Sequence, residues 1–204
     1  MFYEWINEFF YGFDQSIFRF LFEIMKDIPW LYILARIISF FGDHGYFFIF
    51  SALVFLVFRK TRKLGILVGI GLIVGSLLNN TLIKNIVARP RPYDEIEEYF
   101  YMWKYFSESG VKMHSYSFPS GHTCMATVFG IGLFIGLNKK YSWIFILIPL
   151  LMGWSRIALF VHYPSDVLFG MVFGTISIIC AYFLSKLLLK WKFLNNLTIG
   201  DKLF

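Results

Sequence analysis

Long apolar stretches alternate with short polar segments along this chain. Three of the stretches contain no Asp, Glu, Lys or Arg, and each approaches the roughly 20 residues that cross about 30 Å of hydrocarbon as an α-helix. A fourth is interrupted by Arg156 alone, and a shorter fifth begins just after Asp43 and His44. In chain order the five stretches are residues 45–58, 64–83, 118–137, 141–161 and 167–185. The pattern predicts transmembrane helices rather than a soluble core.

The first 44 residues have a different pattern. Residues 2–13 and 16–24 are amphipathic and rich in aromatic side chains, which suits a helix in the membrane interface. Residues 28–41 are apolar apart from Arg36, so they predict a bent or partial span that Pro29 would start. Early acidic residues do not suit a cleaved signal peptide. We therefore expect an all-α, polytopic transmembrane helical bundle of five to six spans with an N-terminal amphipathic helix.

Composition strengthens this interpretation. Of 204 residues, 58% are hydrophobic, 22% are aromatic and only 16% are charged, against about 25% charged in an ordinary soluble domain. Glycines four apart recur in the apolar stretches, and they favour close helix contacts within one chain over a dimer signal. Cys124 and Cys180 both lie in apolar stretches, and we interpret them as small core residues. No Cys/His ligand spacing predicts a metal site.

The net charge is +6, and nine of the 19 Lys and Arg residues fall in three clusters at alternate helix ends. Cytoplasmic loops of membrane proteins carry an excess of Lys and Arg, so we place all three clusters inside. Residues 87–117, the one long loop, then lie outside. Because each cluster adjoins an apolar stretch, we do not expect nucleic-acid binding. The clusters are Arg59/Lys60/Arg62/Lys63, Lys139/Lys140 and Lys186/Lys190/Lys192.

Three short polar segments meet that same outer face. Strong bases, imidazoles and a carboxylate are costly near hydrocarbon, so such a cluster at a membrane edge indicates a functional site. Its composition suits a site that holds a tetrahedral oxyanion and attacks it with a histidine. The segments are Lys84 to Pro92 with Arg91, Pro119-Ser120-Gly121-His122, and Ser155-Arg156 through His162 to Asp166.

The two histidines suggest complementary roles. Pro164 suits the first turn of a helix, which places Asp166 in that turn just after His162. A carboxylate there can accept from one imidazole nitrogen and leave the other with a free lone pair for attack. His122 begins another membrane helix, where it can protonate a leaving oxygen as a general acid. Ser120 and Gly121 precede it at a helix N-terminus, which presents N–H groups to anions.

The cations suit phosphate. The guanidinium fork of Arg156 matches two phosphate oxygens, and Lys84 and Arg91 add charge-assisted contacts. Taken singly, Lys84 or Arg91 would equally suit an anchor at a helix end. The convergence of three segments favours a shared site. His44 and His114 have no such neighbours in sequence, and we interpret both as ordinary loop residues.

These segments resemble the signature of the type 2 phosphatidic acid phosphatase family, which includes bacterial undecaprenyl-diphosphate phosphatases. The matching pattern is Lys, six residues, Arg-Pro; then Pro-Ser-Gly-His; then Ser-Arg, five residues, His, three residues, Asp. Only Arg91 has the required interval from Lys84, so Arg89 is not expected to be the equivalent ligand. The resemblance implies that His162 attacks phosphorus to form a phosphohistidine, that Asp166 orients it, and that His122 protonates the leaving group. It also implies phosphate binding by Lys84, Arg91, Ser120, Gly121 and Arg156.

We therefore expect an integral membrane lipid phosphatase that needs no metal or cofactor. Its leading substrate is the terminal phosphate of undecaprenyl diphosphate at the outer face of the cell membrane. Phosphatidate, lysophosphatidate or phosphatidylglycerol phosphate are alternative substrates, and a lipid phosphotransferase is an alternative activity. Vanadate-dependent haloperoxidases share the superfamily but are soluble, and a non-catalytic lipid binder would usually lack His162 or His122. We expect one membrane-embedded domain, 1–204, with an N-terminal region at 1–44 and the catalytic bundle at 45–190.

Overall fold

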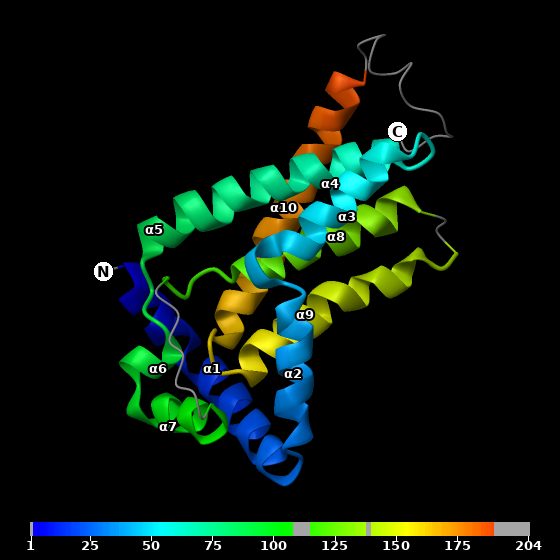
Figure 1. Ribbon diagram of the computed structural model, residues 1–204. Coiled ribbons are helices and arrows are strands. Elements are labelled where there is room, and N and C mark those ends of the chain that lie inside the picture. Colours follow the sequence, from blue (N-terminus) through cyan, green and yellow to red (C-terminus); the bar gives the residue numbers. More distant parts are fainter. Residues whose placement is uncertain (1, 108–114, 138–139, 190–204) are drawn as a thin grey trace.

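The computed structural model describes residues 2–107, 115–137 and 140–189, and the regular elements of these ranges are all helical (Figure 1). The α-helices are α1 (Phe2–Asp27), α2 (Trp30–Phe40), α3 (Tyr46–Val57), α4 (Arg62–Gly75), α5 (Lys84–Val87), α6 (Pro92–Glu95), α7 (Glu97–Phe106), α8 (Gly121–Gly136), α9 (Leu147–Ala158) and α10 (Pro164–Leu188). Two short 3₁₀ turns, η1 (Asp43–Gly45) and η3 (Ser142–Ile146), and one π-helical segment, η2 (Ser76–Ile83), connect them.

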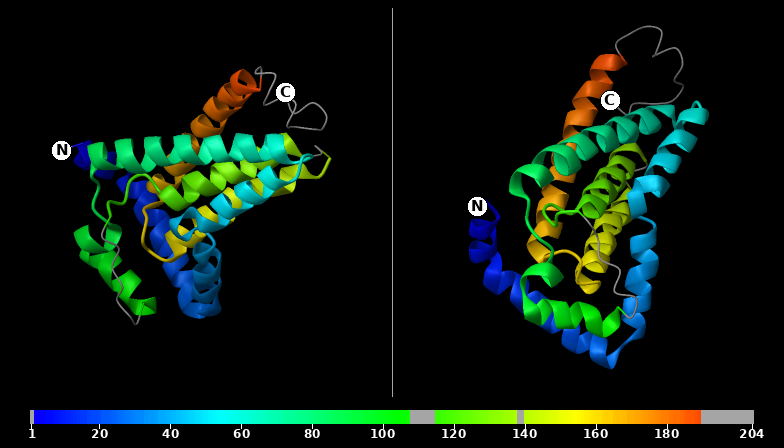
Figure 2. Two further views of the ribbon diagram at one scale, coloured as in Figure 1. Left: turned by 45° about the horizontal axis from the view of Figure 1, so that its top comes forward. Right: turned by 60° about the vertical axis from the view of Figure 1, so that its left-hand side comes forward.

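The apolar helices form a membrane-spanning bundle. In the described residues, three helical stretches are long and apolar enough to cross a membrane, namely Trp30–Val57, Arg62–Glu95 and Pro164–Leu188. Two shorter apolar helical stretches, Gly121–Gly136 and Ser142–Ala158, accompany them. At the centre, α10 packs against α4 and α8, while α3 and α9 flank them (Figures 1 and 2). The all-α transmembrane architecture expected from the sequence is confirmed.

The apolar segments predicted at residues 28–41 and 45–58 form one bent helical stretch. The stretch Trp30–Val57 joins α2 and α3 through η1, so residues 28–41 and 45–58 form two arms of one apolar unit rather than two spans. Its corner is a sharp turn, because His44 and Gly45 both adopt left-handed backbone angles, with φ of 52° and 70°. The corner projects toward the N-terminal end of α8, which η1 contacts.

The N-terminal region is one amphipathic helix rather than two segments. In α1, four residues are buried, Ile6, Asp14, Phe18 and Met25, while most of the aromatic side chains on the other face are exposed. Figure 2 shows α1 lying across the lower end of the bundle, alongside α6 and α7. The buried Phe18 ring packs on Tyr99 of α7 and on Phe160. The helix therefore caps one end of the bundle.

The predicted long loop is structured over much of its length. Residues 92–106 form α6 and α7, whose buried Tyr93, Tyr99 and Trp103 join an aromatic core under α1. The long loop predicted at residues 87–117 therefore contains two short helices that the sequence pattern did not reveal, because these aromatic side chains are buried against α1 and the α9–α10 connection. His114 lies outside the described residues.

Small residues set the helix spacing in the bundle. A Cβ atom on Gly174 of α10 would lie 2.7 Å from the carbonyl oxygen of Cys124 on α8, so only glycine permits this approach. Cys124 is buried, as predicted. Cys180 is exposed on α10, so its prediction as a core residue is wrong; it lies on a face of α10 that the described helices leave uncovered.

Candidate active site

A pocket of about 650 Å³ opens at the end of the bundle that α1 caps, where η1, η2, α8 and the α9–α10 connection meet. Six of the residues proposed from the sequence line it, and five further polar residues join them. The first six are Lys84, Arg91, Gly121, His122, Arg156 and His162, and the additional five are Asp43, His44, Ser76, Asn80 and Ser115. The three sequence segments therefore converge, as expected from their common position at one membrane face.

His162 lies in the connection between α9 and α10 and is buried. Its Nε2 is 3.2 Å from Nη1 of Arg91. Because a guanidinium can only donate, Nε2 accepts, and the ring proton of the neutral imidazole belongs on Nδ1. Burial, reinforced by the nearby Arg91 and Arg156 charges, holds the pKa of His162 well below its usual range. The ring is therefore neutral, with a lone pair on Nε2 facing the pocket cations.

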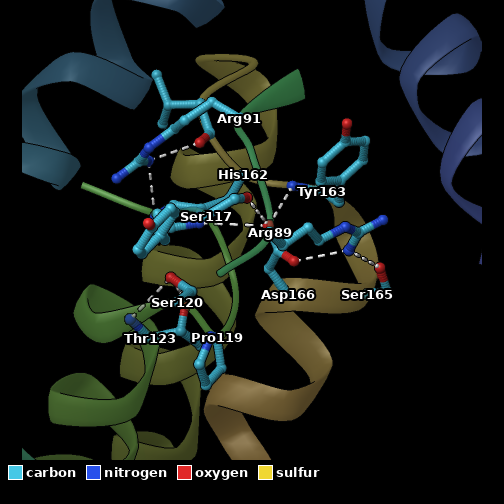
Figure 3. Close-up of polar contacts among 12 residues, drawn as sticks. Arg89, Arg91, Ser117, Pro119, Ser120, Thr123, His162, Tyr163, Ser165 and Asp166 are labelled. Atoms are coloured by element: carbon cyan, nitrogen blue, oxygen red, sulfur yellow. Dashed lines mark hydrogen bonds and ion pairs between the residues drawn. The ribbon is translucent and has the colours of Figure 1, made fainter. Parts of the chain in front are cut away.

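Asp166 lies behind His162 and is fully buried. Its Oδ2 is 3.5 Å from His162 Nδ1, which is an electrostatic contact longer than a typical N–H···O hydrogen bond. The same oxygen accepts from the Tyr163 backbone N–H at 2.9 Å and from the Ser117 hydroxyl (Figure 3). Asp166 thus combines the helix-capping role at the start of α10 with the orienting position expected from the sequence.

A buried ion-pair chain extends from Asp166 to the N-terminal helix. Arg89 donates from Nη1 to Asp166 at 2.7 Å and to the Ser165 hydroxyl at 2.8 Å, and from Nη2 to Asp14 of α1 at 2.9 Å. Its guanidinium also lies 3.6 Å from the centre of the Tyr163 ring (Figure 3). Arg89 does not line the pocket described above. Arg89 is therefore a structural partner of the Asp166 carboxylate. The second carboxylate that it contacts, Asp14, was not predicted from the sequence.

The three pocket cations are held by neutral groups. Lys84 donates to the Tyr116 carbonyl at 3.1 Å, and Arg91 donates to the carbonyls of Ser115 and Val161 at 2.9 and 2.7 Å. Arg156 is buried in α9 and donates to the Ser39 hydroxyl. Because the pocket is lined by these three cations and by one carboxylate, Asp43, it has a positive potential suited to a phosphoryl group.

The N-terminus of α8 borders the pocket through Gly121. A Cβ atom there would lie 2.6 Å from Oδ1 of Asn80, which η2 brings against this turn. The hydroxyl of Ser120 caps α8 by accepting from Thr123, and Ser120 is not among the lining residues of the pocket, so its phosphate-binding role stays a prediction. Its backbone N–H instead donates to the Asp166 carbonyl at 3.0 Å. Ser120 therefore fixes α8 relative to α10.

His122 has a carboxylate partner that the sequence did not reveal. Its Nε2 lies 2.9 Å from Oδ1 of Asp43, in the η1 corner between α2 and α3. A Cβ atom on the preceding Gly42 would lie 2.5 Å from Cδ2 of His122, so glycine is needed for the corner to come this close. His44 also lines the pocket, and its prediction as an ordinary loop residue is wrong because the same corner carries it to the site.

Each histidine of the predicted mechanism thus has its own carboxylate, Asp166 for His162 and Asp43 for His122. In the described part of the chain, no group of three or more His, Cys, Asp and Glu side chains gathers as metal ligands would. The chemistry available at this pocket is nucleophilic attack on an anion, with a second imidazole for proton transfer.

Comparisons with known proteins identify phosphatases among the relatives of this chain. A family model described as the PAP2 superfamily matches residues 63–190. An undecaprenyl-diphosphatase from Sulfolobus acidocaldarius is 31% identical over 59% of this chain and 54% of its own length. A lipid A 1-phosphatase from Rhizobium etli is 29% identical over 72% of this chain and 62% of its own. A decaprenylphosphoryl-5-phosphoribose phosphatase from Mycobacterium tuberculosis is 30% identical, covering 74% of this chain and 78% of its own.

The matches span only about half to three fifths of the length of the first two of these relatives. Among solved structures, a transmembrane PAP2 type phosphatidylglycerolphosphate phosphatase from Bacillus subtilis aligns over 87% of this chain and 89% of its own, with a TM-score of 0.63 and 26% identity. Aquifex aeolicus LpxE shares the fold over 82% of this chain and 93% of its own, with a TM-score of 0.68 and 24% identity. By the match of the family model over most of its apolar helices, the chain belongs to the PAP2 superfamily.

Proposed function

We propose that the protein is a lipid phosphatase that removes the terminal phosphate of a lipid diphosphate, with undecaprenyl diphosphate as the leading substrate. The observation that carries the proposal is the pocket itself, in which His162 and His122 face a cavity lined by three cations. The cations are Lys84, Arg91 and Arg156. An undecaprenyl-diphosphatase among the relatives supports the substrate class.

In the proposed first step, Nε2 of His162 attacks the terminal phosphorus and forms a P–N bond. The bond between phosphorus and the bridging oxygen breaks, and its electron pair leaves with the lipid. His122 donates a proton to that oxygen, with Asp43 holding the imidazole. Arg91, which now contacts Nε2, exchanges this contact for a phosphoryl oxygen when substrate binds.

In the proposed second step, water hydrolyses the phosphohistidine. His122, now neutral, takes a proton from the attacking water, and the P–N bond breaks to release phosphate. The cations stabilise the charge on the phosphoryl oxygens in both steps. No step in this scheme requires a metal ion, so we propose that catalysis is metal-independent.

The orientation of the site is also part of the proposal. The clusters of Lys and Arg at alternate helix ends favour a cytoplasmic side opposite to the pocket, which places the pocket at the extracytoplasmic face. A phosphatidylglycerol phosphate phosphatase is the second candidate, favoured by the likeness to the Bacillus subtilis structure over most of both chains.

The test is phosphate release from undecaprenyl diphosphate and phosphatidylglycerol phosphate by purified protein in detergent with excess chelator. Wild type should release phosphate, and His162→Ala should release none while keeping its elution volume in size-exclusion chromatography. A preference for phosphatidylglycerol phosphate would reverse the order of the two candidates. Activity that survives His162→Ala would reject the phosphohistidine mechanism.

A further inference from the structure

A second groove of about 680 Å³ adjoins the catalytic pocket. It lies between α2, α7 and the end of α9, and Asp43 and Arg156 line both cavities. Its other walls are mainly apolar and aromatic, with Tyr32, Phe40 and Trp103 among them. The groove is therefore continuous with the site of phosphoryl transfer but far less polar.

One charged residue departs from that apolar character. Arg36 lines the groove from α2, whose sequence is otherwise uncharged, and the residue is exposed. Among the described residues, no hydrogen bond or ion pair engages its guanidinium, in contrast to Arg89 and Arg19, which both meet carboxylates. A guanidinium on an apolar helix at a membrane edge is costly without a partner, and phosphate is a preferred one.

The direction of the chemistry connects the groove to the substrate. In phosphoryl transfer the attacking and leaving oxygens or nitrogens lie roughly in line, so the leaving oxygen points away from His162. The proposed acid for that oxygen is His122, whose Nε2 contacts Asp43 at the boundary of the two cavities. The leaving group therefore extends toward the groove.

We propose that this groove binds the leaving lipid monophosphate of a lipid diphosphate substrate, with Arg36 as the ligand of its phosphate. The inference rests on the proposed function and deepens it, because it requires a substrate with two phosphates. When the bond between the terminal phosphorus and the bridging oxygen breaks, His122 supplies the proton to that oxygen. The phosphate that remains on the lipid lies beside Arg36, and the aromatic walls contact the first carbons of the lipid.

Charge complementarity supports this occupant. The groove carries two arginines against one carboxylate, and that carboxylate, Asp43, is directed at His122. The leaving group of a lipid monophosphate is a neutral alcohol, which carries no charge that Arg36 could pair with. The two substrate classes therefore depend differently on this residue.

The experiment compares farnesyl diphosphate with farnesyl phosphate, which share one tail, on wild type, Arg36→Gln and Arg36→Lys. We expect Arg36→Gln to lower kcat/KM for the diphosphate by about tenfold or more, the size of a lost charge-assisted hydrogen bond, and to change the monophosphate by less than about twofold. Arg36→Lys should restore part of the loss. Arg59→Gln, which removes an exposed arginine at a basic cluster remote from both cavities, should change neither rate.

Equal losses on both substrates, or no loss on either, would overturn the subsite and leave the phosphatase assignment standing. If wild type hydrolyses the monophosphate and ignores the diphosphate, the subsite and the diphosphate substrate are both rejected, and a lipid monophosphate phosphatase remains. If wild type hydrolyses neither lipid, the proposed function and the subsite fail together. Wild-type activity therefore separates failure of the function from failure of the inference.

Discussion

The contact between Asp43 and His122 makes a sharp prediction about the general acid. Asp43→Asn keeps the shape of the side chain but removes the charge that faces Nε2 across 2.9 Å. A hydrogen bond to a charged group contributes about 1.5–3 kcal/mol. Since the Asp43 side chain is 48% exposed, solvent screens it and the lower end applies. The lost stabilisation of protonated His122, about 1.5 kcal/mol, corresponds to roughly a tenfold lower rate.

The assay compares two substrates, one whose leaving group needs protonation and one whose leaving group does not, so that a defect in proton transfer can be told from a general loss of activity. Release of p-nitrophenol needs no protonation, so the pre-steady-state burst from p-nitrophenyl phosphate should change little in Asp43→Asn. Single-turnover cleavage of farnesyl phosphate, whose alkoxide must be protonated, should slow by about tenfold. Asp27→Asn, an exposed carboxylate at the end of α1, is the matched control and should match wild type on both substrates. Equal slowing on both substrates would refute the role, because it would indicate a general loss of structure.

Three further predictions follow from the buried groups. Asp14→Asn should lower the unfolding temperature and destabilise the protein by about 1–3 kcal/mol, because it removes a charged acceptor from Arg89 and Ser165 while Arg89 keeps its ion pair with Asp166; an unchanged unfolding temperature would contradict the ion-pair chain. On its acid side, the profile of kcat/KM against pH should fall only as the pH drops through the depressed pKa of His162, so this acid limb should lie below the ordinary imidazole pKa of about 6.5; an acid limb at or above that value would contradict a neutral, buried His162. Activity should survive excess chelator, and a loss reversed by added metal would indicate a metal hydrolase.

The convergence of the three polar segments on one pocket was predictable because their sequence patterns are local. Charged and imidazole side chains stand out in an apolar chain, and fixed intervals such as that between His162 and Asp166 are visible without a structure. The apolar stretches likewise predicted the bundle, since their lengths match a bilayer. Arg36 was visible too, as an interruption of an apolar segment, but its position beside the site was not.

The partners of those segments were not predictable in the same way. Asp43 is 79 residues from His122, and Asp14 is 75 residues from Arg89 and 151 from Ser165, so only the tertiary fold brings them together. Each lies on a segment that suits a simpler interpretation, an interfacial helix for Asp14 and a loop before a span for Asp43. The π-helical geometry of η2, which brings Asn80 to the pocket, has no signature in an apolar stretch that suits a regular helix.

The ion-pair chain of α1 also has a consequence for biogenesis. Asp14 of α1 leaves the ribosome well before its partners Arg89 and Ser165 are synthesised, and Ser165 belongs to the first turn of α10. Until α10 inserts, the carboxylate of Asp14 has to remain hydrated at the membrane surface, because burying it without its partners is too costly. Docking of α1 therefore waits for the insertion of α10, and the same event completes the surroundings of Asp166. A chain still being inserted consequently has no assembled catalytic centre with which to act on membrane lipids.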